Sequence, residues 1–343
     1  MRLIRGLTNL KQFSQQPEAP LASGCVATIG NFDGVHLGHQ TIIDQVREKA
    51  RALNVPSVVM VFEPQPREFF QADDAPPRLM PFRQKFEALL TSGIDIVLCL
   101  RFNDKFRSYS GMGFIEDVLI RGLGVHHLVV GDDFRFGCDR AGDFALLRSV
   151  GEKQGFSVEN TRTVEVAGDR VSSTRIRQVL AENRLSDAED LLGHPYRICG
   201  RVVYGQQLGR QIGAPTANVL LPRMPALRGV YVVVATLADG RVLDGVANIG
   251  VRPTVDGKQP SLEVHLLDFA GTLYGQRIDV VFRHFLRDEV KFDSVDDLKH
   301  QIARDFDDAR AWIDISTTLH NAVDHVGRQY QPLRTLAQIR LNQ

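Results

Sequence analysis

The sequence has few cysteines, and they follow no metal-binding or redox pattern. Cys25, Cys99, Cys138 and Cys199 lie far apart and form no CxxC pair. Such usage argues against a disulfide framework or a zinc site. Because Cys25 and Cys99 lie inside apolar runs, we expect buried free thiols in a reducing compartment.

The sequence also lacks a long apolar run and an excess of either charge. Its longest apolar runs, such as 96–100, are far too short to span a bilayer, and its first residues contain no apolar core of signal-peptide length. Lys plus Arg and Asp plus Glu number 41 each, so the net charge is +0, without the basic surplus of a nucleic-acid-binding protein. We expect a cytoplasmic protein with small-molecule partners and neither a nucleic-acid nor a membrane partner. The oligomeric state stays open.

The 343 residues favour two domains of ordinary size. Up to about residue 185, apolar strand-like runs alternate with helical patterns. The predicted strands are 25–29, 55–62, 94–100, 127–130 and 157–165, and the predicted helices are 41–47, 83–91, 111–123, 142–154 and 177–181. This alternation predicts a Rossmann-like α/β domain over 1–185, with a parallel sheet wrapped by helices and ligands at the carboxyl ends of the strands.

The pattern changes after a short predicted helix at 185–192. Strands then follow one another, at 197–204, 229–237, 242–249, 261–269 and 276–286. Consecutive strands without helices predict a small antiparallel β-barrel in a second domain over 186–312. Ser294 as N-cap, with apolar residues every fourth position from Leu298, predicts a closing helix. Residues 313–343 are expected to form a further helical tail, to which we assign no role.

The segment Gly30–Gln40 is the most informative in the sequence. It links the predicted strand 25–29 to a helix, and carries His36 and His39 where the helix begins. Free backbone N–H groups and the helix dipole suit phosphate at such a place. Imidazoles there can donate hydrogen bonds to a triphosphate and to the charge that develops when its α-phosphorus is attacked. The alternative is structural: one histidine caps the helix and the other packs against the sheet.

A second motif, Val171–Arg177, also precedes a helical pattern. Its serines and threonine can cap the helix and offer hydroxyls to phosphate, and Arg177 adds a fork of donors. Alone, it could equally be a capped surface helix with solvated arginines. Both motifs in one α/β domain favour a nucleotide-phosphate site.

A third motif, Gly205–Asn218, lies in the predicted barrel. It is not a Walker A loop, since no Gly-Lys-Ser/Thr follows. Its glycines let the backbone curl close to an anion, although a purely structural turn is the open alternative. Thr216 and Asn218 are two apart, so in an extended segment they point to one face, and their oxygens suit Mg²⁺.

The first two motifs, with the segments 62–68 and 131–137, resemble the nucleotidyltransferase domain of bacterial FAD synthetases. The resemblance implies that His36 and His39 contact the ATP phosphates as catalytic residues. It implies nucleotide or flavin binding by Gly30, Asn31, Phe32, Asp33, Gly38, Phe62, Asp132, Phe134, Ser172, Thr174 and Arg177. Many relatives have histidine in place of Gln65, which leaves the role of that side chain undecided.

The barrel segments 209–218, 229–231, 247–250 and 262–268 resemble riboflavin kinase, and the match runs to the helix at 298–310. The resemblance implies that Thr216 and Asn218 bind Mg-ATP and that Glu263 is the catalytic base. Nucleotide binding is implied for Gly205, Gly209, Arg210 and Gly213.

Together the two matches are in the order expected of a bacterial bifunctional riboflavin kinase/FAD synthetase. The expected reactions are phosphorylation of riboflavin to FMN by Mg-ATP, then adenylylation of FMN by a second ATP to FAD and pyrophosphate. Two other functions are compatible with part of these motifs. A class I aminoacyl-tRNA synthetase fragment shares the His-x-Gly-His step but needs a Lys-Met-Ser-Lys-type loop, which the sequence lacks. A flavin-binding regulator without catalysis is disfavoured by Thr216, Asn218 and Glu263.

Overall fold

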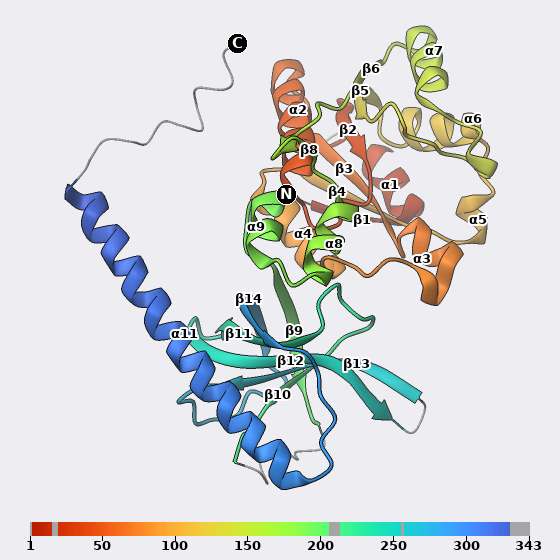
Figure 1. The fold of residues 1–343 in the computed structure, drawn as a ribbon. Helices are drawn as coiled ribbons and strands as arrows, with labels where there is room; N and C mark the ends of the chain where they lie inside the picture. Colours follow the sequence, from red (N-terminus) through yellow and green to blue (C-terminus); the bar gives the residue numbers. More distant parts are fainter. Residues whose placement is uncertain (1, 16–19, 206–212, 255–256, 330–343) are drawn as a thin grey trace.

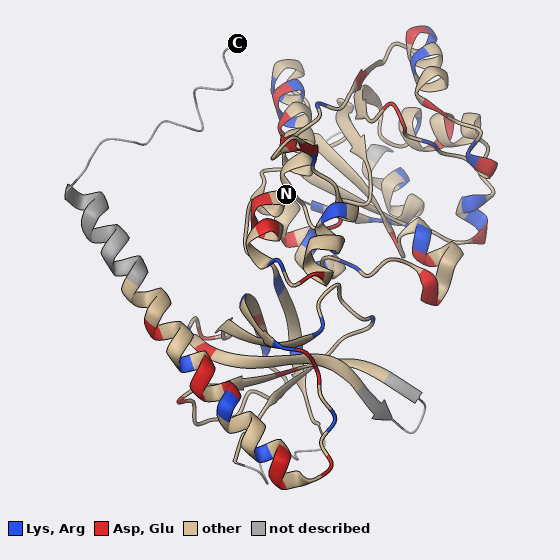
Figure 2. Cartoon of the chain, in the orientation of Figure 1, with Lys and Arg blue, Asp and Glu red and all other residues tan. Residues whose placement is uncertain are grey.

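The computed structural model describes residues 2–15, 20–205, 213–254 and 257–329. Two layered units lie one above the other in Figure 1, an α/β unit that contains the N-terminus and a β-barrel crossed by the last helix. In Figure 2 the positions of basic and acidic residues are interspersed along both units, in keeping with the net charge of +0. None of the described helices has the length and apolar character that a membrane crossing needs.

The first unit is built on a parallel sheet of six strands in the order β1-β4-β3-β2-β5-β6. The strands are β1 (Arg2–Arg5), β2 (Cys25–Ile29), β3 (Ser57–Glu63), β4 (Ile96–Arg101), β5 (Val125–Val130) and β6 (Ser157–Asn160). From β2 the chain builds outward first through β3 and β4, and later through β5 and β6. The carboxyl ends of β2 and β5 therefore flank the point where the order reverses, which is where open α/β sheets bind ligands.

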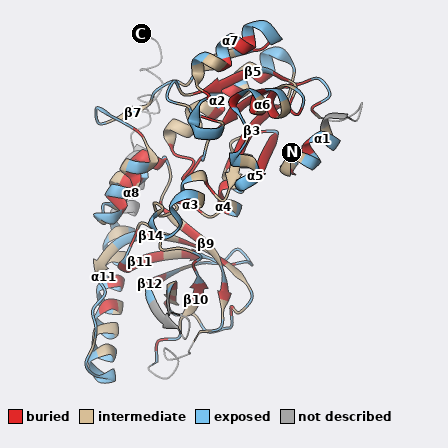
Figure 3. Ribbon diagram, turned by 90° about the vertical axis from the view of Figure 1, so that its right-hand side faces the viewer, coloured by how far each residue is buried: buried red, intermediate tan, exposed pale blue. Residues whose placement is uncertain are grey.

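Helices cover both faces of this sheet. They are α1 (Gly6–Gln15), α2 (Leu37–Leu53), α3 (Pro66–Gln71), α4 (Phe82–Thr91), α5 (Asp104–Arg107), α6 (Gly111–Phe114), which continues as the π-helical η2 (Ile115–Ile120), and α7 (Phe144–Gln154), with short 3₁₀ turns η1 (Ala72–Asp74) and η3 (Cys138–Arg140). Successive strand residues point to opposite faces. Val26 accordingly packs with α2 and α4, and Ala27 packs with α1, η2 and α7. In Figure 3 the strands are mostly buried and the helices expose their outer sides.

The predicted α/β class is confirmed, with two local corrections. The predicted strand 157–165 ends at Asn160, because Arg162 N–H is bonded to the Gln45 side chain on α2 rather than to the sheet. The two-residue β7 (Glu165–Val166) instead pairs with β8 (Asp169–Arg170). The prediction also missed β1 and α1. All four cysteines are free, and Cys25 and Cys99 are buried, as predicted.

The second unit is a closed antiparallel barrel in the order β10-β13-β12-β11-β14-β9. Its strands are β9 (Arg197–Val203), β10 (Ala217–Leu220), β11 (Gly229–Thr236), β12 (Val242–Thr254), β13 (Gly257–Leu266) and β14 (Arg277–Arg287). The predicted barrel is therefore confirmed. β10 was not named among the predicted strands, because only its short extended stretch around Thr216 and Asn218 was recognised.

The closing helix α11 (Val295–Gln329) begins where predicted, with Ser294 Oγ accepting the Asp297 N–H at 3.1 Å. It runs without interruption past residue 312, the predicted end of the second domain. Phe306, Trp312 and Ile313 pack on the outside of the barrel around Val232. Arg287 of β14 forms a two-point ion pair with Asp305 of α11, with both hydrogen bonds at 2.7 Å.

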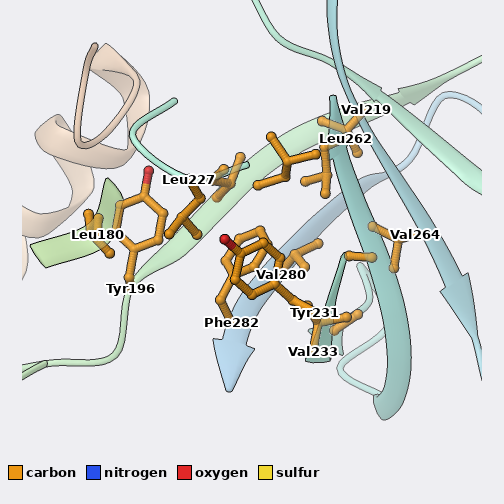
Figure 4. Close-up of a cluster of buried hydrophobic side chains, with 14 of the residues drawn as sticks. Leu180, Tyr196, Val219, Leu227, Tyr231, Val233, Leu262, Val264, Val280 and Phe282 are labelled. Atoms are coloured by element: carbon orange, nitrogen blue, oxygen red, sulfur yellow. The ribbon is translucent and has the colours of Figure 1, made fainter. Parts of the chain in front are cut away.

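One apolar cluster spans the junction of the two units, apart from the clusters on the two faces of the parallel sheet. α8 (Ser173–Ala181) and α9 (Leu185–Leu192) lie between them, and the predicted division at residue 185 coincides with the first residue of α9. Figure 4 shows Leu180 of α8 beside Tyr196, with Leu227 and Phe282 of the barrel unit nearby, all in one cluster. A hydrogen bond from Gln40 Nε2 on α2 to the Leu192 carbonyl (3.2 Å) adds a polar link. The site after β2 is thus close to the start of the barrel.

Candidate active sites

The two histidines of the first motif lie at the N-terminus of α2, directly after β2. His36 is the N-cap residue, and its Nδ1 accepts the His39 N–H at 3.3 Å. The two rings stack with centroids 3.6 Å apart, and His39 also packs on Phe32. The capping alternative is therefore real for His36. Because Nδ1 is the acceptor, the neutral His36 ring carries its proton on Nε2 and keeps that N–H as a donor.

Both imidazoles are neutral at pH 7 in the free protein. Burial, and to a smaller extent the positive charge of Arg177, lowers the pKa of His36 to about 4. Burial likewise holds the pKa of His39 well below its ordinary value, with added contributions from His36 and Lys85. A neutral imidazole can donate its N–H to a phosphate oxygen without placing a buried positive charge at the N-terminus of α2.

Asp33, in the same loop, points into the protein and not into solvent. It is 1% exposed, and its carboxylate accepts the N–H groups of Leu79 (3.1 Å) and Met80 (3.3 Å). It also forms an ion pair with Arg177, whose Nε donates to the Pro77 carbonyl at 2.6 Å. Asp33 therefore fixes the guanidinium of Arg177 at the start of α8, where Ser172 caps the helix by accepting the Arg175 N–H.

The first and second motifs meet around one cavity of about 550 Å³. The predicted residues that line it are Asn31, Asp33, His36, Gly38, His39, Ser172, Thr174 and Arg177. The histidines come from the β2–α2 junction, and Ser172 and Thr174 come from the start of α8, about 135 residues later in the chain. This convergence makes a site with hydroxyl, imidazole and guanidinium donors, a donor set that suits a polyphosphate.

A second cavity of about 800 Å³ adjoins the first. Asn31 and Arg67 line both cavities. Its wall is largely aromatic: the predicted residues Phe62 and Phe134 line it together with Phe136, which stacks on Phe134 at 5.5 Å between ring centroids. Other residues of the wall include Gly30, Phe70, Phe102, Phe106, Tyr109 and Phe114. Such a surface fits a flat conjugated ring.

Two predicted residues line neither of these cavities. Phe32 is 1% exposed and belongs to the core under α2 and α4, where it supports His39. Asp132 is exposed, and its neighbour Asp133 lines the first cavity instead. Sequence reasoning missed Asp133 and also the loop Thr161–Val164, which lines the same cavity. The loop has no recognisable sequence pattern of its own, because its position depends on hydrogen bonds with Gln45 of α2, which is distant in the sequence.

In the barrel, Glu263 lies between two asparagines on neighbouring strands. Asn218 of β10 and Asn248 of β12 are both its direct cross-strand partners. Asn218 is buried, and its Nδ2 donates to the Thr216 carbonyl at 3.3 Å. Asn248 Oδ1 is buried without a hydrogen-bond partner in the described part of the chain. The predicted base and predicted metal ligands therefore occupy one patch of the barrel.

Thr216 lines two barrel cavities. One, of about 270 Å³, also contains Glu263, Asn248, His265, Glu289 and Phe306. The other, of about 350 Å³, is formed with the loop Phe269–Tyr274. Thr216 thus lies between the two cavities.

The glycines of the third motif have different surroundings. Gly205 lies against the Asn218 amide, because a Cβ there would come within 2.6 Å of Nδ2. Gly213 has a φ of +80° and is exposed. Gly209 and Arg210 lie outside the described residues, so their predicted roles stay predictions.

The oxygen atoms around Thr216 fit Mg²⁺. The Thr216 hydroxyl and the Asn218 amide carbonyl are hard oxygen ligands of the kind that Mg²⁺ prefers, and the unpartnered Asn248 Oδ1 lies on a neighbouring strand. Among the described residues there is no cluster of three or more His, Cys, Asp and Glu side chains placed to hold a metal ion. Any Mg²⁺ here would therefore complete its shell with water and phosphate oxygens.

Comparison with known proteins gives one family match in the α/β unit and a second one that covers the barrel. Residues 18–175 match a family model described as FAD synthetase, and residues 192–313 match one described as riboflavin kinase. A protein of Pseudomonas fluorescens named bifunctional riboflavin kinase/FMN adenylyltransferase is 55% identical over 314 residues, covering 91% of this chain and 97% of its own. A protein of the same name from Escherichia coli K12 is 51% identical and covers 89% and 96%.

One solved structure is similar over most of the chain. It is titled a macrolide-efflux protein from Streptococcus pneumoniae, is 31% identical and has a TM-score of 0.71. The match covers 84% of this chain and 94% of that one, so it spans both units.

Proposed function

The chain belongs to the family of bifunctional riboflavin kinase/FMN adenylyltransferases, and on that premise we propose which of its residues perform each reaction. The barrel unit phosphorylates riboflavin with ATP to give FMN. The α/β unit then transfers an adenylyl group from a second ATP to FMN, giving FAD and pyrophosphate. The family gives the two activities, and the assignment of residues is our proposal.

For the phosphorylation, we assign Glu263 as the general base. Its carboxylate accepts the proton of the terminal ribityl hydroxyl while that oxygen attacks the γ-phosphorus of ATP. The bond from the γ-phosphorus to its bridging oxygen breaks, and ADP leaves. Thr216 and Asn218 would hold Mg²⁺, which neutralises phosphate charge and orients the γ-phosphoryl group when it is bound.

For the adenylyl transfer, no base is needed, because a phosphate oxygen of FMN is already an anionic nucleophile. It attacks the α-phosphorus of ATP, and the electron pair of the broken bond leaves with pyrophosphate. His36, His39, Ser172, Thr174 and Arg177 donate hydrogen bonds to the triphosphate and to the charge that moves onto the leaving group. The aromatic cavity around Phe62 and Phe134 receives the isoalloxazine ring.

One observation carries this assignment for the α/β unit. Donors from two distant motifs line one cavity, and an aromatic cavity opens beside it through Asn31 and Arg67. This is the pairing that a triphosphate and a flavin need if the FMN phosphate is to reach the α-phosphorus. The free buried thiols agree with a cytoplasmic location. We keep 1–185, 186–312 and 313–343 as the proposed division of the chain.

The direct test mixes the pure protein with riboflavin, ATP and magnesium and separates the flavins by chromatography. We expect FMN to appear first and FAD to follow. Tight flavin binding with neither product would favour a catalytically inactive flavin-binding regulator and contradict the proposal.

A further inference from the structure

The turn between β3 and α3 is held by a partly buried ion cluster. Arg78 Nε donates to Glu68 at 2.5 Å, and its two terminal nitrogens donate to Glu63 at 2.5 and 3.2 Å. Glu68 in turn accepts the Gln65 N–H at 2.9 Å. Burial alone would raise the pKa of Glu68, but the hydrogen bonds from Arg78 and from Gln65 N–H outweigh it and hold that pKa below its ordinary value. The position of Gln65 is therefore set before any ligand arrives.

The side chain of Gln65 is left with an unused donor. The residue is only 6% exposed, and Nε2 has no hydrogen-bond partner in the described part of the chain. A buried amide N–H without a partner is destabilising, so such groups call for an explanation. Gln65 lines the 550 Å³ cavity that contains His36 and Arg177. An amide nitrogen is a donor, so a ligand bound in this cavity would satisfy it through an acceptor atom.

Gln65 lies at the wall between the two cavities of the α/β unit. It lines the phosphate-donor cavity, the next residue Pro66 lines the aromatic cavity, and Arg67 lines both. A flavin in the aromatic cavity that extends its phosphate toward the triphosphate would bring that phosphate close to this turn, since Arg67 lines both cavities. The group closest to the unused donor would then be the nucleophilic phosphate.

We propose that Gln65 Nε2 donates a hydrogen bond to a non-bridging oxygen of the FMN phosphate and so aligns another of its oxygens with the α-phosphorus of ATP. This inference rests on the proposed adenylyl transfer in this cavity. Gln65 gives up no proton. One P–O bond forms to the FMN phosphate, one breaks at the α-phosphorus, and the electron pair leaves with pyrophosphate.

The first test is Gln65→Met, which keeps the size of the side chain and removes the donor. We expect kcat/KM for FMN to fall about 10- to 100-fold, since a hydrogen bond to a charged group is lost. The KM for FMN should rise while the KM for ATP stays unchanged, and riboflavin phosphorylation should be unaffected. The unfolding temperature should not fall, because the change removes an unpaired buried donor.

Gln84→Met is the matched control. Gln84 is equally buried, but its Nε2 donates to the Arg197 carbonyl at 3.1 Å, and it does not line either cavity. This variant should lower the unfolding temperature and leave adenylyl transfer unchanged, the opposite of Gln65→Met.

A third variant separates a hydrogen-bonding role from a packing role. Gln65→Glu has nearly the same shape but places an acceptor and a negative charge beside the phosphate, so FAD formation should be slower than in Gln65→Met. If Gln65→Glu is instead the more active of the two, or if Gln65→Met stays within twofold of the wild type, the inference is overturned. A rise in the KM for ATP alone would overturn the assignment to the FMN phosphate. Failure of the wild-type protein to convert FMN to FAD would instead refute the proposed function on which the inference rests.

Discussion

Asn218 and Glu263 lie directly opposite each other across β10 and β13. They are 45 positions apart in the sequence, and antiparallel pairing of the barrel strands makes them neighbours. Side chains opposite each other in such a pair have Cβ atoms about 4.5–5.5 Å apart. The group that would hold Mg²⁺ and the group that would accept the riboflavin proton therefore share one rung of the barrel.

The first prediction concerns this rung. Glu263→Gln keeps the shape and removes the base, so FMN formation from riboflavin should fall about 10²- to 10⁴-fold. Conversion of added FMN to FAD should continue at the wild-type rate. Chromatography of the flavins with riboflavin or FMN as substrate measures both. Glu289→Gln, in the same cavity, should cost far less; an equal loss would remove the case for Glu263 as the base.

The second prediction separates the two functions of His36, capping and donation. Asparagine is a favoured N-cap residue, so His36→Asn should keep α2 capped while it removes the Nε2–H donor. FAD formation should fall about 10²- to 10³-fold, with little change in unfolding temperature and with FMN still accumulating from riboflavin. His36→Ala should lose both functions and about 1 kcal/mol of stability. Wild-type FAD formation by His36→Asn would mean that the imidazole only caps the helix.

The third prediction concerns the buried pair of Asp33 and Arg177. Asp33→Asn removes the charge that holds Arg177 and weakens the bonds to the Leu79 and Met80 N–H groups. Breaking a buried ion pair costs about 3–5 kcal/mol, and adenylyl transfer should fall because Arg177 is no longer fixed. Denaturant unfolding and FAD assays measure the two effects. Asp95→Asn, which weakens contacts to Ser57 beyond both cavities, should affect stability only.

The fourth prediction is a dependence of stability on pH. An unfolded histidine takes up its proton near pH 6.5, whereas the pKa of folded His36 is about 4. The unfolded state therefore binds more protons between these values, and the free energy of unfolding falls as the pH drops. Urea midpoints from pH 7 to pH 4.5 should fall less steeply for His36→Asn than for the wild type. Parallel curves would contradict the low pKa.

The fifth prediction concerns the metal. Chelation of divalent cations should stop riboflavin phosphorylation, and added Mg²⁺ should restore it. Thr216→Val removes one oxygen ligand at constant shape, so it should raise the Mg²⁺ concentration needed for half-maximal FMN formation. An unchanged magnesium requirement would show that Thr216 does not bind the ion.

The sequence predicted both units because their cores depend on local patterns. The runs 58–62 and 96–100 are apolar without interruption, which is typical of a buried strand, and the barrel strands are separated by turns. The edge strand Arg2–Arg5 was missed because only Ile4 in it is buried. The predicted strand after Ser157 was too long because a contact from α2 ends it, and such a contact leaves no mark in nearby residues.

The sequence could predict candidate site residues that lie inside a motif, but not those that only the fold brings beside it. His36, His39 and Arg177 were found because they lie at helix starts. Asn248 received no role, because only the register of β12 against β13 brings it beside Glu263. The burial of the Asp33 carboxylate could likewise not be predicted, since the Leu79 and Met80 N–H groups that it accepts belong to a separate loop.

The apolar core that passes through α8 and α9 makes the stability of each unit depend on the other. A cut at residue 185 would leave Ile176 and Leu180 bare on one fragment and Leu191 and Tyr196 bare on the other. To be stable alone, each fragment would need polar residues in place of the apolar ones that the cut exposes. A substitution at this junction, remote from every cavity, would stop the supply of FMN and of FAD together.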